Sequence, residues 1–273
     1  MKKNNYKIVV FTDLKESLSN TLKSTLSLAK MIKGEIGLFH VKKASDVVTK
    51  ESQLSAIRSI NNEYIDMDKK IKSIVQSFSK DFGVPITYSF AIGNLKNEIA
   101  NYIDVHKPDI VVLGKKKSNV FNLVSDNLIQ FVLNQHKGPV FLTDEKNVLE
   151  LNNELSFGIL NDKEQSSVND FTEGLLSNSQ KPLKSFKIVE NSDALKTNQT
   201  TKKRKEVEFI FEKNDNSIRN LSNYITKSNI SLLCVNRSND KRSKNDSITP
   251  NISDVIDTLK VPLILMGQSN NTL

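Results

Sequence analysis

Histidine and cysteine, the residue types that often bind metals or act as nucleophiles, are rare in this sequence. The three histidines, His40, His106 and His136, have no spacing typical of a metal pair, and no Asp/Glu cluster completes a site around them. The one cysteine, Cys234, lies in an apolar segment, where a buried thiol is unreactive. A Gly-x-Ser-x-Gly elbow, a Walker loop and a Ser-Gly-Gly motif are also absent from the sequence. We therefore expect no catalytic residue and no metal site.

Runs of basic residues are the second feature that could bind a ligand. Lys115, Lys116 and Lys117 follow an apolar segment, and residues 202–205 read Lys-Lys-Arg-Lys. The net charge is +8, and residues 1–150 hold 22 of the 39 Lys/Arg but only 16 of the 31 Asp/Glu. Such runs attract anions, including phosphates and nucleic acids. Because residues 202–205 have no aromatic neighbours and most lysines lie at helix-face spacing, we interpret the charge mainly as solvated surface.

The composition is typical of a globular protein of the cytoplasm. Hydrophobic residues make up 37% and charged residues 26% of the 273 residues, which is enough apolar content for a core. No apolar run approaches the roughly 18 residues of a membrane span. The basic start of the chain is followed only by the apolar run 8–11, which is too short for a signal peptide. One cysteine excludes an intrachain disulfide, so we expect a cytoplasmic location with no membrane partner.

The first 143 residues alternate short apolar segments with helical patterns. Gly34 is expected to end the first of these helices. This alternation is the signature of a parallel sheet covered on both faces by crossover helices. The predicted strands are 6–13, 35–41, 86–92, 110–113 and 139–142.

The second half repeats this order in a weaker form, which indicates duplication. Its residues 191–206, at the place of a long helix in the first half, are polar and are expected to form a mobile loop. We predict two domains, residues 1–145 and 154–273, joined by a short polar linker and packed together. The expected fold class is α/β, with two tandem open five-stranded parallel sheets and helices on both faces, the second copy degenerate. The second-half strands are 155–160, 185–189, 207–211, 230–235 and 261–266.

Several segments, in this order and at these distances, resemble universal stress proteins. The resemblance covers the first half nearly end to end, and the second half by element order and by residues 261–264. It implies a Rossmann-like fold of the adenine nucleotide alpha hydrolase type, with strand order 3-2-1-4-5. The first-half segments that carry it are Lys7–Asp13, Leu38–Val41, Gly93-Asn94, Pro108–Gly114 and Gly138–Val140.

The resemblance also implies a ligand crevice where the winding of the sheet reverses, between strands one and four. Asp13 and Gly114 would flank it, with Val41 on the rim. ATP-binding members carry three glycines and a Ser or Thr in the loop after strand four, whereas this sequence keeps Gly114 and has Lys117 at the second glycine position. Ser125-Asp126-Asn127 lie near the third position, and the aspartate would repel a phosphate. Lys115, Lys116 and Lys117 could replace backbone donors as point charges.

Three functional hypotheses follow for this chain, in which the pocket of the first half is interpreted as vestigial. The leading hypothesis is a non-enzymatic regulatory or stress-response protein that has lost ATP as a cofactor, with residues 139–142 and 262–266 pairing to form an internal pseudo-dimer; a further homodimer is compatible with it. The second is an ATP-binding switch through Asp13, Val41, Gly114 and the three lysines 115–117. The third is an interaction module for a polyanion such as nucleic acid, which rests only on the charge of the first half. The second half has no glycine after its fourth strand and is expected to bind no nucleotide.

Overall fold

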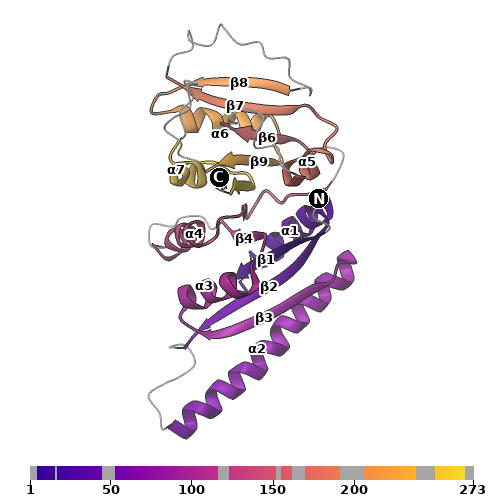
Figure 1. The fold of residues 1–273 in the computed structure, drawn as a ribbon, viewed down its shortest axis with the longest axis vertical. Helices are drawn as coiled ribbons and strands as arrows, with labels where there is room; N and C mark the ends of the chain where they lie inside the picture. The colour runs from indigo at the N-terminus through magenta and orange to yellow at the C-terminus, as the bar shows by residue number, and fades with distance from the viewer. Residues whose placement is uncertain are drawn as a thin grey trace, which may run out of the picture.

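Strands and helices alternate along the chain in the computed structural model (Figure 1). It describes residues 5–15, 17–44, 53–115, 123–151, 155–161, 170–190, 206–237 and 250–267. The first half comprises β1 (Tyr6–Thr12), α1 (Leu18–Ile32), β2 (Gly34–Lys43), α2 (Gln53–Phe82), β3 (Ile86–Gly93), α3 (Leu95–His106), β4 (Ile110–Gly114), α4 (Leu123–Gln135) and β5 (Val140–Thr143). The second comprises β6 (Phe157–Leu160), α5 (Asp170–Leu176), β7 (Leu183–Val189), β8 (Glu206–Glu212), α6 (Ser217–Lys227), β9 (Leu232–Asn236), α7 (Ile252–Thr258) and β10 (Leu263–Met266).

Each half has the predicted strand order. The sheet runs β3-β2-β1-β4-β5-β10-β9-β6-β7-β8, which is 3-2-1-4-5 in the first half and the same order in the second, read from the other edge. All pairs within a half are parallel, as crossover helices require. The α/β fold class is confirmed. The expectation of two sheets is refined, because the halves share one continuous sheet.

The two halves meet at β5 and β10, the strands that we expected to pair. They are antiparallel, with Val140 opposite Leu265 and Leu142 opposite Leu263. These two pairs exchange under a twofold axis through the central pair, so the register itself relates the halves by a pseudo-twofold. Each of the two strands covers an edge that would otherwise be open to pairing with another chain.

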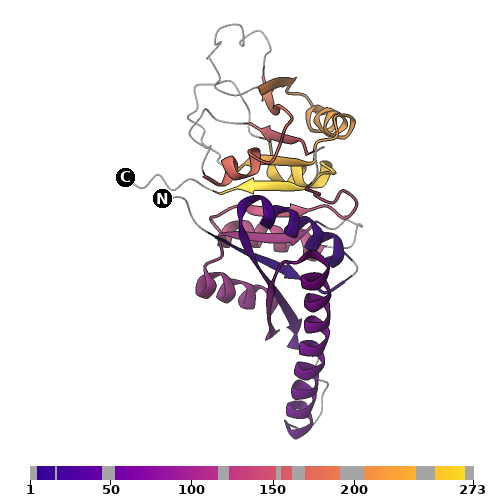
Figure 2. The same cartoon turned by 90° about the vertical axis from the view of Figure 1, so that its right-hand side faces the viewer.

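The core lies in two layers, one on each face of the sheet, and both layers extend through both halves. One layer joins α1, α2 and α5, with Leu26 and Phe171 among its buried side chains. The other joins α3, α4, α6 and α7, with Ile129 and Val255 among them. Figures 1 and 2 show these two sets of helices on opposite faces of the sheet. Continuous strands such as β4, which is buried along Ile110–Leu113, fit between two apolar layers.

α2 is longer than the strand that it covers. Its 30 residues span about 45 Å, whereas the eight residues of β3 span about 26 Å. Its C-terminal part buries Met67, Ile71 and Val75 on the sheet, and its N-terminal part projects beyond the strands (Figures 1 and 2). Ile57, near the N-terminal end of α2, is 56% exposed, and so is Tyr64, although its ring centroid lies 4.5 Å from that of Phe90 on β3.

Two of the sequence predictions concern the end of α1 and the polar loop 191–206. Gly34 does not end α1, because the left-handed residue there is Lys33, with φ 57°, and Gly34 already belongs to β2. A side chain at Gly34 would collide with Cδ1 of Ile8, so this buried side chain would have to move aside. The predicted polar loop 191–206 lies outside the described residues except for Glu206, the first residue of β8.

Candidate functional site

The predicted crevice lies where β1 and β4 end side by side. The two strands pair from Ile8 opposite Ile110 to Phe11 opposite Leu113, so their carboxyl ends reach the same edge of the sheet. Asp13 follows β1, and Gly114 is the last residue of β4. From this point β2 lies on one side and β5 on the other, which is the reversal of winding that creates ligand sites in open parallel sheets.

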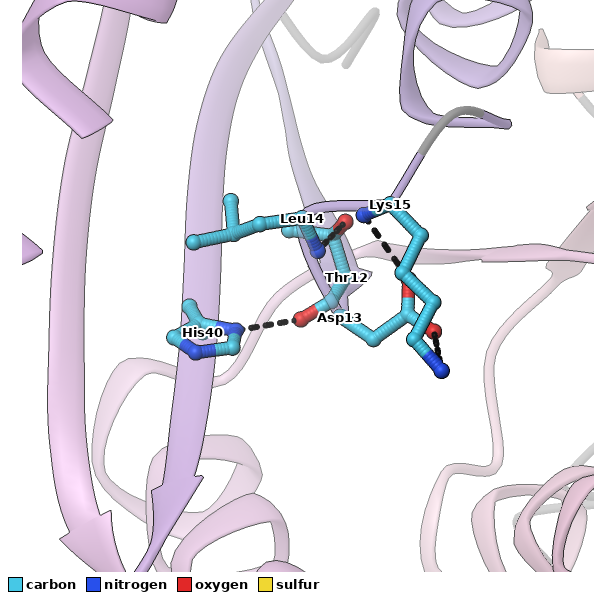
Figure 3. A network of polar contacts seen from close by, with 5 residues as sticks. All are labelled: Thr12, Asp13, Leu14, Lys15 and His40. Atoms are coloured by element: carbon cyan, nitrogen blue, oxygen red, sulfur yellow. Dashed lines mark hydrogen bonds and ion pairs between the residues drawn. The ribbon is translucent and has the colours of Figure 1, made fainter. Parts of the chain in front are cut away.

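Asp13 belongs to a tight turn that satisfies its own polar groups (Figure 3). Its Oδ1 accepts a hydrogen bond of 3.2 Å from the backbone N–H of Lys15, and its Oδ2 lies 3.8 Å from the Lys15 ammonium. The N–H of Leu14 donates to Thr12 Oγ1 at 3.0 Å, and Leu14 has a positive φ of 58°. The Asp13 side chain is 39% exposed. The turn presents a carboxylate to solvent, beside the exposed ammonium group of Lys15.

His40, on β2, faces this turn but is bound to the backbone (Figure 3). Its Nδ1 lies 2.8 Å from the carbonyl oxygen of Thr12, to which it donates, and its side chain is buried. Burial lowers the pKa of His40, although the bond to Thr12 opposes this shift. The neighbouring Val41 is also buried and packs into the layer of α3 and α4. The prediction that His40 is satisfied locally is confirmed, and Val41 lies in the core close to the crevice.

Gly114 packs against two buried threonines. A side chain at this position would bring its Cβ to 3.1 Å from Thr21 Oγ1 and 3.9 Å from Thr143 Oγ1. The two hydroxyls are hydrogen-bonded to each other at 3.0 Å, and they join α1 to β5 behind the end of β4. The close approach of α1 therefore disfavours a side chain here, because the buried Thr21 hydroxyl would have to move by a few tenths of an ångström.

Lys115 points away from the crevice and into the second half. Its Nζ donates to the backbone carbonyl of Leu259, just past the end of α7, while its N–H donates to the Thr143 carbonyl at 2.8 Å. Burial lowers the pKa of the Lys115 ammonium, and Asp144 and Asp257 partly oppose this shift. The predicted residues Lys116 and Lys117 lie outside the described residues, so the structure brings only Asp13, Gly114 and the backbone of Lys115 to this edge.

The corresponding edge of the second half contains a residue that the sequence analysis missed. β6 ends before Asn161, which is 4% exposed and whose side chain accepts a hydrogen bond from the N–H of Ile188 at 3.3 Å. β9 ends at Asn236, and the next residue, Arg237, is only 7% exposed. The signal that could have found Arg237 is its position, because it follows the fourth strand as Lys115 does.

Other chemistry is limited in the part of the chain that the structure describes. No group of three or more His, Cys, Asp or Glu there could hold a metal ion, and Cys234 is buried. A pocket of about 290 Å³ lies between α5 and the starts of β6 and β7, with Phe157, Glu173 and Leu183 in its lining. It is at the amino ends of the strands, opposite the edge where parallel sheets bind ligands. None of the described helices is both long and apolar enough to cross a membrane.

Comparison with known proteins identifies the fold. No protein-family model and no curated protein matches the sequence. The structure is similar to a universal stress protein from Archaeoglobus fulgidus, with a TM-score of 0.70 and 14% identity over 96% of this chain and 98% of that chain. It is also similar to a functionally unknown protein from Pseudomonas aeruginosa, with a TM-score of 0.53 and 13% identity over 96% and 92% of the chains. The chain therefore has the universal stress protein fold, and the strand order shows that this fold occurs twice.

Proposed function

We propose that this chain is a non-enzymatic regulatory or stress-response protein of the universal stress protein type, in which the two halves form an internal pseudo-dimer and the crevices hold no ATP. In this proposal the protein acts in the cytoplasm through contacts of its surface with other proteins.

The observation that carries the proposal is the direction of Lys115. A lysine after β4 could bind a phosphate only if its ammonium reached the crevice, but its Nζ bonds to the carbonyl of Leu259 in the other half. Asp13 adds a negative charge at the crevice, and a phosphate beside it would be repelled. At the glycine that remains, Gly114, the close approach of Thr21 disfavours a side chain.

The histidine near the crevice is also engaged elsewhere. His40 is bound to the Thr12 carbonyl, and its lowered pKa favours the neutral ring. A general base must reach the proton that it removes, and a buried imidazole fixed to the backbone is poorly placed to do so. This supports a role in binding and regulation rather than in catalysis.

The pairing of β5 with β10 supports the proposed pseudo-dimer. These strands have their free edges covered by each other, so a second copy of the chain would have to join at another surface. The outer strands of the sheet are β3 and β8. In this proposal one chain supplies the unit that two separate copies would otherwise have to assemble.

Isothermal titration of ATP into the full chain, with and without Mg²⁺, tests the proposal. We expect no heat of binding and no change in melting temperature, since a ligand that binds the native state must stabilise it. Binding of one ATP per chain at micromolar affinity would contradict the proposal and support the switch. In that case, replacing Lys115, Lys116 and Lys117 with glutamate tells whether the lysines hold the nucleotide.

A further inference from the structure

Arg237 makes an unusually complete set of bonds across the boundary between the halves. Its Nη2 donates to the carbonyl of Gly138 at 2.6 Å, and its Nη1 donates to the carbonyl of Leu133 at 3.1 Å. Its Nε donates to the carbonyl of Met266 at 2.8 Å. Further bonds reach the carbonyls of His136 and Lys137 at 3.3–3.4 Å. Except for Met266, all these acceptors belong to the first half.

Four of these acceptors, the carbonyls of Leu133, His136, Lys137 and Gly138, lie at the end of helix α4 or just beyond it. α4 ends at Gln135, and the carbonyls of the last turn and of the residues beyond have no partner within the helix. The Leu133 carbonyl, in the last turn of α4, lies at the negative end of the helix dipole, where a cation is favourable. The planar guanidinium of Arg237, with its five donors, can bond to several of these carbonyls at once.

Lys115 makes the corresponding contact in the opposite direction, from the first half to the second. Gly114 pairs with Thr143 in the first half and Asn236 pairs with Met266 in the second, so the residue after each fourth strand, Lys115 or Arg237, occupies the same position. The pseudo-twofold that relates β5 to β10 also relates α4 to α7. Lys115 bonds to the carbonyl of Leu259 just past the end of α7, as Arg237 bonds to those past the end of α4.

We propose that Arg237 and Lys115 form a reciprocal lock, in which the cation after the fourth strand of each half caps the last helix of the other half and holds β5 and β10 together. Lys115 and Arg237 are the first residues of the loops that follow β4 and β9, and a loop that covers a ligand in each crevice would begin there. The lock therefore holds the two halves together, and the same contacts keep these two cations out of the crevices.

The bonding of Arg237 predicts that its loss is costly. All the partners described above are backbone carbonyls, and the side chain is 7% exposed. Without the guanidinium, buried acceptors would be left without donors. The equilibrium constant for opening of the structure around them should then rise by about tenfold or more. The effect should appear where the halves meet rather than within either half.

Hydrogen exchange of the full-length Arg237→Met variant tests the lock. We expect exchange in β5 and β10 to accelerate by about tenfold relative to the unmodified chain, with β1 and β2 much less affected. The matched control is Arg219→Met, which removes an exposed arginine from α6 of the same half. It should leave exchange in β5 and β10 unchanged.

Two further variants keep the test decisive. Arg237→Lys keeps the charge but loses the fork, and Lys115→Met removes only the smaller contact, so both should fold and accelerate exchange at β5 and β10 to a lesser degree. Unchanged exchange in these strands in all three variants, or an equal acceleration in every strand, would overturn the lock.

Discussion

His40 and His136 are the two buried imidazoles of the described structure, and each lies against a backbone carbonyl. His136 Nε2 is 3.3 Å from the Asp109 carbonyl. Burial lowers its pKa, the nearby charge of Arg237 acts in the same direction, and bonds to the backbone oppose the shift. Both rings are therefore neutral in the folded protein under conditions where an exposed histidine would begin to bind a proton.

The sign of the resulting pH dependence follows from these directions. The unfolded chain binds protons at both histidines below about pH 6.5, while the folded chain resists doing so. The free energy of unfolding should therefore fall as the pH drops through 6.5, by at most about 1.4 kcal/mol per pH unit for each histidine. Urea unfolding between pH 7.5 and 5.5 measures this slope.

The variant His40→Gln should reduce that slope and keep a donor for the Thr12 carbonyl. His106→Gln is the control substitution, because His106 is exposed at the end of α3. An identical slope in the unmodified chain and in His40→Gln would show that burial of His40 does not contribute to acid sensitivity.

At this scale the sequence predicted Asp13 and Gly114 at the crevice and a locally satisfied His40. It could not predict the lock, because Leu259 is 144 residues from Lys115 and Gly138 is 99 residues from Arg237. The lysine run suggested a phosphate site by its composition. Only the spatial approach of the second half gives Lys115 another acceptor.

The elements show how the same fold is built from unequal sequences. β3 packs Ile86, Tyr88 and Phe90 on the face that α2 covers. By strand register, the corresponding positions of β8 are Glu206, Glu208 and Ile210. Glu208 is paired with Lys187 at 2.6 Å, and Ile210 is 41% exposed. The order of strands could be predicted because strands are short apolar runs, whereas the covering of each face depends on partners distant in sequence.

Two glycines in the second half allow a matched prediction. A methyl group at Gly158, on β6, would lie 2.7 Å from a ring carbon of Phe186 and 2.8 Å from Leu233 Cδ1. Gly158→Ala should therefore cost about 1–3 kcal/mol, since the packed core must shift. Gly174, in α5, has its nearest atom at 3.7 Å, so Gly174→Ala should stabilise the helix by up to about 1 kcal/mol. Thermal unfolding of the two variants checks both signs, and equal effects would contradict this packing.

The molecule as a whole is built on one sheet between two continuous apolar layers. Tyr6 and Phe171 meet edge to face across the halves, at 5.8 Å between ring centroids, on the side of α1 and α5. On the other side, Gln130 of α4 donates to the hydroxyl of Ser253 of α7 at 3.1 Å. The linker also packs, since Leu149 is buried and its N–H donates to Ser24 at 3.0 Å. These contacts connect the halves on both faces of the sheet, beside the pairing of β5 with β10. The predicted domain boundaries, 1–145 and 154–273, stay a prediction.

The measurement that tests this account most directly is hydrogen exchange of the full chain, with and without saturating MgATP. We predict that β5 and β10 exchange as slowly as β1 and β4, and that MgATP changes exchange neither after β1, at residues 13–15, nor after β4, at residues 114–115. Slower exchange at those residues with MgATP would mean that the crevice still binds nucleotide. Fast exchange confined to β5 and β10 would mean that the halves are not joined as one unit.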